Sequence, residues 1–229
     1  MLRHLPNTLT CCNLLCGSVG VVSVLDGSPS FPAAYFVWLA LVFDFLDGFA
    51  ARSLGVTLPI GKELDSLADV VSFGLLPSVL IYTLLKAEAP AGYLPWAGLV
   101  VVVFSALRLA KFNVDDTQTD SFKGLPTPAN ALFLTGLPFL PGAVQEFLFQ
   151  PYLLAGISVA FSLLLVSRID LFALKFKDFS WRNNKMQFTF LIVSVLLLVI
   201  FKFAAIPLII IFYILLSLSK VVASVPRVH

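Results

Sequence analysis

Long apolar segments constrain this chain more than any other feature, because a run of ~20 apolar residues can cross a bilayer as a helix that satisfies its own backbone. Hydrophobic residues make up 59% of the 229, and charged residues only 12%, where a soluble domain carries roughly a quarter. Eight apolar runs cover residues 10–26, 32–53, 66–85, 93–112, 126–141, 146–167, 187–202 and 206–223. The sequence therefore predicts an all-α, polytopic membrane protein with about eight transmembrane helices.

The connections between these runs are short and carry turn signals, such as "DGSPSFP" at 26–32 and "KAEAPAGYLP" at 86–95. No internal repeat separates the chain into units, so a single domain over 1–229 is expected. The N-terminal residues lack the order of elements that is typical of a cleaved secretory signal. The first helix is therefore expected in the mature protein.

Basic residues predict the orientation, because Lys and Arg are retained on the cytoplasmic side during insertion. With eight spans, Lys86 and Lys202 fall on one side and the other basic residues fall on the opposite side. Those thirteen are Arg3, Arg52, Lys62, Arg108, Lys111, Lys123, Arg168, Lys175, Lys177, Arg182, Lys185, Lys220 and Arg227. Both termini should be cytoplasmic, in a cell inner membrane. A net charge of +2 is too small to indicate a nucleic-acid partner.

Four aspartates interrupt this apolar pattern in the stretch "DFLDGFAARSLGVTLPIGKELDSLAD". Asp44 and Asp47 are three residues apart at the end of the second run, and Asp65 and Asp69 are four apart at the start of the third. Each spacing places the pair on one face of a helix. Two antiparallel helices can therefore direct all four carboxylates to a common point near the cytoplasmic face.

Clustered carboxylates in a membrane helix need a counter-charge, and a divalent cation supplies one. Oxygen ligands favour Mg²⁺ or Mn²⁺ over zinc or copper. The two histidines, His4 and His229, lie at the chain ends and are expected to be solvated. Cys11, Cys12 and Cys16 lie in the first run, where cysteine packs as a small hydrophobic residue.

The spacing of this stretch resembles the signature of the CDP-alcohol phosphotransferase family at every specified position. Written out, it is Asp44-x2-Asp47-Gly48-x2-Ala51-Arg52-x8-Gly61-x3-Asp65-x3-Asp69. The resemblance implies a membrane enzyme that transfers a substituted phosphoryl group from a CDP-linked donor to an alcohol and releases CMP. It also implies that the enzyme is a homodimer, as members of the family commonly are.

The same resemblance implies a role for each residue of the motif. The four aspartates hold two Mg²⁺ or Mn²⁺ ions, and Asp69 also accepts the proton of the acceptor hydroxyl. Gly48, Ala51 and Gly61 leave space for the cytidine, and Arg52 contacts the donor's phosphates. Small residues in membrane helices more often serve close helix packing, so this alternative stays open for the two glycines and the alanine.

Three further segments resemble the phosphatidylserine synthase branch of that family: "LPNTLTCCNLLCG" at 5–17, "ALRLAKFNV" at 106–114 and "FKGLPTPANA" at 122–131. This resemblance implies CDP-diacylglycerol as donor and L-serine as acceptor. It places Arg108, Lys111, Asn113 and Lys123 around the carboxylate of serine or a lipid phosphate. The branch more often has Arg at the position of Lys111, and lysine lacks the planar fork that binds a carboxylate in two places.

Two alternative functions remain open at this stage. Another acceptor, glycerol 3-phosphate or an inositol phosphate, would need a more basic pocket near the metals. A divalent-cation transporter would also use intramembrane carboxylates. The outer halves of the predicted helices, however, offer no second ring of polar ligands.

Overall fold

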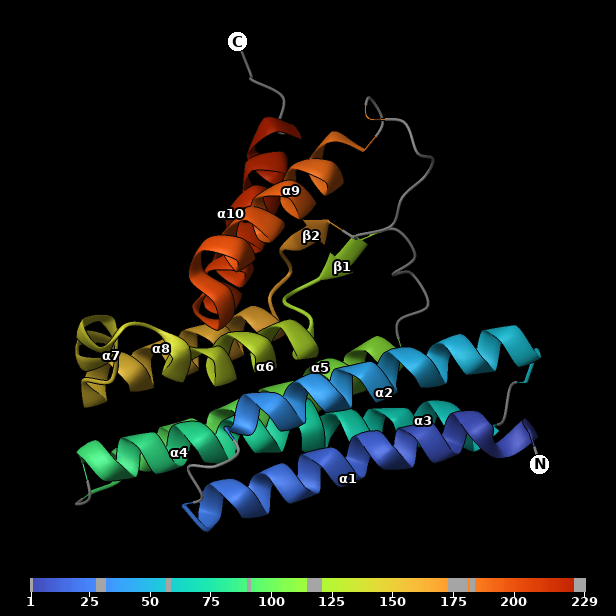
Figure 1. Ribbon diagram of the computed structural model, residues 1–229, viewed down its shortest axis with the longest axis horizontal. Helices are drawn as coiled ribbons and strands as arrows, with labels where there is room; N and C mark the ends of the chain where they lie inside the picture. The colour runs from blue at the N-terminus through green and yellow to red at the C-terminus, as the bar shows by residue number, and fades with distance from the viewer. Residues whose placement is uncertain are drawn as a thin grey trace.

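The computed structural model describes residues 2–27, 32–56, 59–89, 92–114, 121–172, 181 and 184–224. Long helices form a slab, and the hairpin of α9 and α10 projects from it (Figure 1). The slab contains η1 (Leu2–His4), α1 (Leu5–Leu25), α2 (Ala33–Leu54), α3 (Pro59–Asp69), η2 (Val70–Leu75), α4 (Leu76–Glu88), η3 (Leu94–Leu99), α5 (Val100–Val114), α6 (Thr127–Gly136), η4 (Leu137–Phe139), α7 (Gly142–Leu148) and α8 (Pro151–Leu165). The hairpin contains α9 (Lys185–Phe201), η5 (Lys202–Ala204) and α10 (Ala205–Ser224).

The predicted membrane architecture is confirmed in its coarse form, because the described chain is mostly helical and helices occupy all eight apolar runs. Among the residues that the structure describes, five stretches are long and apolar enough to cross a membrane: Leu5–Leu25, Ala33–Leu54, Ile60–Glu88, Leu94–Val114 and Lys185–Ser219. A sixth arises if α7 and α8, which meet at 80°, form one span. The protein is therefore a multi-pass membrane protein. Lys175, Lys177, Arg182, Arg227 and His229 lie outside the described residues.

The third span changes its helical geometry midway. Residues Val70–Leu75 form a π-helix, in which the Leu76 N–H donates to the carbonyl of Val71, five residues earlier. Pro77 follows directly and has no N–H to donate to the preceding turn, which disfavours a regular α-helix there. Such π-helical turns occur frequently at functional sites. This one begins immediately after Asp69.

A small antiparallel ladder, which the all-α prediction did not include, connects two distant segments. Strand β1 (Ser121–Lys123) pairs with β2 (Asp170–Phe172), with Lys123 opposite Asp170. Gly124 then donates its N–H to the carbonyl of Ile169 at 2.9 Å. Gly124 has φ +78°, and a Cβ there would collide with the Leu165 carbonyl oxygen. This turn therefore needs glycine, and it fixes the ladder to the end of α8.

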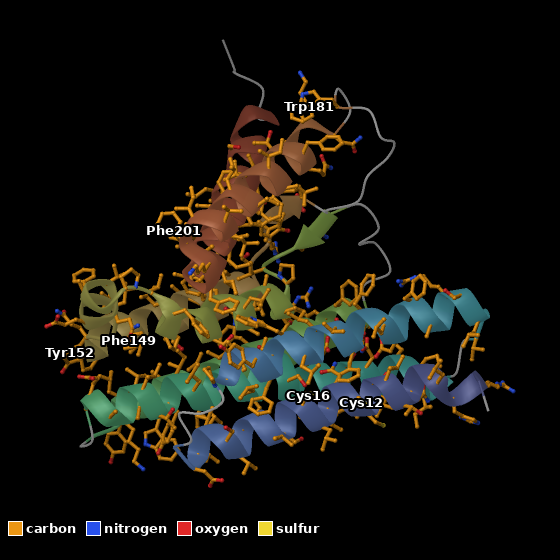
Figure 2. The ribbon with its side chains drawn as sticks, viewed as in Figure 1. Cys12, Cys16, Phe149, Tyr152, Trp181 and Phe201 are labelled. Atoms are coloured by element: carbon orange, nitrogen blue, oxygen red, sulfur yellow. The ribbon has the colours of Figure 1, made fainter. Side chains whose placement is uncertain are left out.

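Two clusters of the core lie mainly between the helices of the slab, and a third joins the slab to the hairpin of α9 and α10. Much of the outer apolar surface is exposed and available to lipid. Phe133 of α6 and Phe161 of α8 stack with ring centroids 3.7 Å apart. Figure 2 places Trp181 and Phe201 at opposite ends of α9, and Tyr152 with Phe149 at the α7 end of the slab. Tyr152 is 85% exposed, as is typical of aromatic residues near a membrane interface.

Of the three cysteines, which were expected to pack as small hydrophobic residues, Cys16 packs against the core, whereas Cys11 is exposed. Cys12 and Cys16 lie along α1 (Figure 2), and all three thiols, including that of Cys11, are free. Cys16 packs against a buried cluster that includes Phe73 and Leu76. No described residue pairs with them in a disulfide.

Helix α1 packs closely on the π-helix η2, and glycine permits the approach. A Cβ added at Gly17 would lie 2.6 Å from the Cα of Ser72 and 2.9 Å from its nitrogen. We expect Gly17→Ala to lower the free energy of unfolding by about 1–3 kcal/mol, the usual cost of overpacking. Thermal unfolding in detergent measures this effect. Gly156→Ala is the matched control, because a Cβ there meets no atom within 4 Å; equal midpoints for the two variants would contradict the close packing.

Candidate active site

The four aspartates of the motif lie at the facing ends of two helices. Asp44 and Asp47 belong to the last turns of α2, and Asp65 and Asp69 belong to α3, which runs back within the slab (Figure 1). Carboxylate oxygens of Asp44, Asp47 and Asp65 lie within 4.8 Å of one another. We call these three residues the acidic cluster. Their convergence follows from the i, i+3 and i, i+4 spacings on antiparallel helices.

Asp69 lies beside the acidic cluster but is not one of its three members. Its carboxylate interacts electrostatically with those of Asp44 and Asp65. The side chain is only 8% exposed, and the Nδ2 of Asn13 donates to its Oδ1 at 3.2 Å. Asp69 is therefore held one helical turn beyond Asp65 by a contact from another helix.

Helix α1 contributes polar side chains that the sequence reasoning did not assign to the site. Thr10 donates its hydroxyl to Asp47 Oδ2 at 2.6 Å, and the fully buried Asn13 contacts Asp69. The hydroxyl of Ser72 donates to the backbone carbonyl of Asn13 at 2.9 Å. A signal for this role is present in "LPNTLTCCN", where Asn7, Thr10 and Asn13 recur every three residues in a mainly apolar helix.

The acidic cluster fits a hard divalent cation. All of its donor atoms are carboxylate oxygens, which Mg²⁺ and Mn²⁺ prefer. Oδ1 of Asp65 is buried and has no hydrogen-bond partner among the described residues, and the same is true of Oδ1 of Asn13. Buried acceptors without a partner are costly, so a ligand at these positions would relieve the cost. The free acceptors therefore indicate a cation site.

A pocket of about 250 Å³ opens directly beside the acidic cluster. Its lining includes Pro6, Asn7, Thr10, Asp47, Gly48, Ala51, Val56, Gly61, Lys62 and Asp65. The three small residues predicted to leave space for cytidine thus lie together. The guanidinium of Arg52 extends over Gly48, where a Cβ would be 3.3 Å from its Nη1. We call this space the nucleotide pocket, after the expectation from the sequence that its small residues leave space for a cytidine.

A second pocket, of about 470 Å³, is lined in part by Arg108. Its lining is Arg108, Lys111, Phe112, Val114, Lys123, Leu165, Val166, Ser167 and Arg168. Four of these side chains are cationic, so we call it the basic pocket. The structure brings three of the four predicted acceptor-binding residues together here and adds Arg168, which the sequence reasoning did not assign to the site.

Asn113, the fourth predicted acceptor-binding residue, is engaged elsewhere. Its side-chain amide donates to the hydroxyl of Ser66 at 2.8 Å, and its backbone carbonyl accepts from Lys62 Nζ at 2.8 Å. Asn113 therefore connects the end of α5 to α3. It is not among the residues that line the basic pocket.

Arg108 links the basic pocket to the acidic side of the site. Its Nη1 donates to the hydroxyl of Thr127 at 3.0 Å, which fixes the guanidinium between α5 and α6. The carboxylate of Asp69 is close enough to interact electrostatically with it. The site thus combines the acidic cluster, a pocket lined by small residues and a basic pocket that shares Arg108 with the Asp69 side.

Comparison with known proteins agrees with this arrangement. A family model described as CDP-alcohol phosphatidyltransferase matches residues 3–166. The chain is 33% identical over 169 residues to a CDP-diacylglycerol--serine O-phosphatidyltransferase of Bacillus subtilis (strain 168), covering 73% of this chain and 89% of the relative. It is 32% identical over 209 residues to the Helicobacter pylori (strain J99) protein of that name, covering 86% of this chain and 81% of the relative.

An archaeal relative broadens the comparison. The archaetidylserine synthase of Methanothermobacter thermautotrophicus is 35% identical over 170 residues, which cover 72% of this chain and 68% of the relative. The family match includes all four aspartates and both pockets' residues up to Val166. From the motif, the site geometry and these matches, the chain belongs to the CDP-alcohol phosphatidyltransferase family.

Proposed function

We propose that this protein transfers the phosphatidyl group of CDP-diacylglycerol to the hydroxyl of L-serine and releases CMP. The observation that carries the proposal is the position of Arg108, which lines the basic pocket and is close enough to Asp69 to interact with it electrostatically. A serine whose carboxylate binds in the basic pocket can then present its hydroxyl to Asp69. Relatives named for serine transfer support the same acceptor.

The donor's CDP group is assigned to the nucleotide pocket. Gly48, Ala51 and Gly61 give the cytidine room there, and Arg52 is placed over Gly48 to meet the diphosphate. Asp44, Asp47 and Asp65, with Asp69 beside them, would hold two Mg²⁺ or Mn²⁺ ions. When bound, the ions would neutralise the diphosphate and the charge that develops on the attacking and leaving oxygens.

The reaction exchanges one phosphorus–oxygen bond for another. The serine oxygen bonds to the phosphorus that carries the diacylglycerol, and the bond from that phosphorus to the CMP oxygen breaks. Asp69 accepts the proton of the serine hydroxyl, since its carboxylate interacts electrostatically with Arg108 of the basic pocket. Asn13 holds the Asp69 carboxylate through its amide during this transfer.

An anionic acceptor such as glycerol 3-phosphate or an inositol phosphate is the second candidate. The observation in its favour is the charge of the basic pocket. Its four positive charges are more than one carboxylate needs for neutralisation; they belong to Arg108, Lys111, Lys123 and Arg168. Lys123 stands opposite Asp170 in the β-ladder, which offsets part of that charge. This offset favours serine.

A test of the acceptor uses the purified protein in detergent with CDP-diacylglycerol and Mn²⁺ or Mg²⁺. We expect CMP release when L-serine is added, and little release with glycerol 3-phosphate or inositol phosphate. Release with a phosphorylated acceptor and none with serine would disprove serine as the acceptor. The thermal unfolding midpoint with CMP tests the third alternative. CMP should raise the midpoint of a transferase, whichever acceptor it uses, and leave that of a cation transporter unchanged.

The finer architecture is also proposed on the grounds of charge and family resemblance. The chain forms one domain with eight spans, both termini are cytoplasmic, and the active site opens to the cytoplasm in a cell inner membrane. A homodimer is proposed from the family resemblance. The donor lipid fits this location, because its tails stay in the bilayer while its CDP head reaches cytoplasmic water.

Topology gives a direct prediction from the distribution of basic residues. A reporter fused after His229 and a thiol label placed at Lys123 should both report the cytoplasmic side, because thirteen Lys and Arg residues accumulate there and two do not. Label accessibility in sealed vesicles of known orientation measures this. A signal from the opposite side at either position would contradict the eight-span arrangement.

A further inference from the structure

The C-terminal hairpin lies beyond the family match, which ends at residue 166, yet it packs against the wall of the basic pocket. Its contact residue is Tyr213 of α10, which is only 7% exposed. The Tyr213 hydroxyl donates to the backbone carbonyl of Phe172 in β2 at 2.9 Å. The two rings also pack with centroids 5.0 Å apart.

Strand β2 in turn determines where two cations of the basic pocket lie. Lys123 pairs in register with Asp170 of β2, and Arg168 stands two residues before the strand. The carbonyl of Ile169, between Arg168 and the strand, accepts the Gly124 N–H. A displacement of β2 would therefore move Lys123 and Arg168 together.

Tyr213 also lies near Arg108, another cation of the basic pocket. It is close enough to Arg108 for the two side chains to interact electrostatically. Leu165, which lines the pocket, and Leu125 belong to the same buried cluster as Tyr213, Phe172 and Phe190. Tyr213 of the hairpin thus packs with residues that line the basic pocket or hold strand β2 beside it.

We propose that Tyr213 is a positioning residue for the acceptor, whose hydroxyl bond to β2 sets the spacing of the cations that bind the acceptor's acidic group. This inference rests on the proposed function. It assigns the C-terminal hairpin a part in acceptor binding, beyond the matched family region. A hydroxyl that only anchored the hairpin would affect stability and leave the acceptor's KM unchanged.

Tyr213→Phe tests the proposal, because it keeps the ring packing and removes only the hydroxyl. We expect the KM for L-serine to rise about 3- to 10-fold, the range that corresponds to one hydrogen bond. The KM for CDP-diacylglycerol and kcat should stay within about twofold, since Tyr213 does not line the nucleotide pocket. The preference for serine over serinamide, which lacks the carboxylate, should narrow by a similar factor.

Ser217→Ala is the matched control on the same helix. Ser217 is also buried, but its hydroxyl bonds only to the carbonyl of Tyr213 within α10, at 2.8 Å. Thermal unfolding midpoints of both variants show whether each retains the fold. We expect this control to leave the serine KM and the serinamide preference as in the wild type.

The outcomes separate this inference from the proposed function. Equal changes in the KM for serine and for CDP-diacylglycerol, or a Tyr213→Phe variant with the kinetics of Ser217→Ala, would overturn the positioning role. If the wild type uses glycerol 3-phosphate and not serine, the proposed acceptor fails. In that case a raised KM for glycerol 3-phosphate in Tyr213→Phe would still support the positioning role, and an unchanged one would overturn it.

Discussion

Asp69→Asn is expected to lower serine-dependent CMP release ~10²- to 10⁴-fold, the usual cost of losing a general base. The substitution keeps the size of the side chain and an oxygen that can accept from Asn13, but it removes the group that takes the proton. Because asparagine keeps an oxygen ligand and the three carboxylates of the acidic cluster stay in place, we expect the variant still to bind CDP-diacylglycerol with metal. Turnover should therefore fall much more than substrate affinity.

Initial rates of CMP release and a CMP thermal shift measure these two effects separately. Asp26→Asn is the matched control, since Asp26 follows the far end of α1, about 20 Å along the helix axis from Asn13. The control should match the wild type in both measurements. Near-normal serine-dependent turnover in Asp69→Asn would place the base at another residue.

Asp65→Ala is the second change with a large expected effect, here on cation binding. Asp65 contributes an oxygen to the acidic cluster, and its Oδ1 has no partner among the described residues. We expect Mn²⁺ affinity to fall at least ~10²-fold. Removal of a residue that only hydrogen-bonds to a metal ligand typically lowers metal affinity about 10- to 100-fold, and Asp65 is proposed as a direct ligand. Electron paramagnetic resonance of free Mn²⁺ measures this without any turnover.

Activity of Asp65→Ala should fall in parallel with cation binding, and higher Mn²⁺ should recover part of it. Glu63→Ala serves as the control, because Glu63 is an exposed acid on the same helix, two residues before Asp65. Unchanged Mn²⁺ binding in Asp65→Ala would rule out the acidic cluster as the cation site.

The aspartate arrangement could be predicted from the sequence because it depends on local periodicity. Spacings of three and four residues place Asp44 with Asp47, and Asp65 with Asp69, on one helix face whatever the rest of the chain does. The short connection between α2 and α3 then makes the two helices antiparallel neighbours. The grouping of Gly48, Ala51 and Gly61 at one pocket follows from the same geometry.

The contribution of α1 was harder to predict, because it depends on packing between helices. Thr10 and Asn13 reach Asp47 and Asp69 only because Gly17 lets α1 approach the π-helix closely. The π-helix itself has no clear periodic signature in an apolar run. Contacts between residues that are far apart in the sequence, such as these, cannot be predicted from the spacing of residues along one helix.

The basic pocket shows the same limit of local patterns. Arg108, Lys111 and Lys123 lie close together in the chain and were expected to meet, whereas Arg168 reaches them through pairing of two three-residue strands. Asn113 was expected at the same mouth, but α3 offers its amide a nearer partner in Ser66. Side-chain partners of this kind depend on the tertiary fold.

The most direct measurement of the central claim is the fate of labelled serine. Purified protein is incubated with CDP-diacylglycerol, Mn²⁺ and L-serine that carries ¹³C and ¹⁵N, and the lipid product is examined by mass spectrometry beside the CMP released. We predict phosphatidylserine that contains the whole labelled serine, in equal amount to CMP. CMP release with phosphatidic acid and no labelled lipid would contradict transfer to serine.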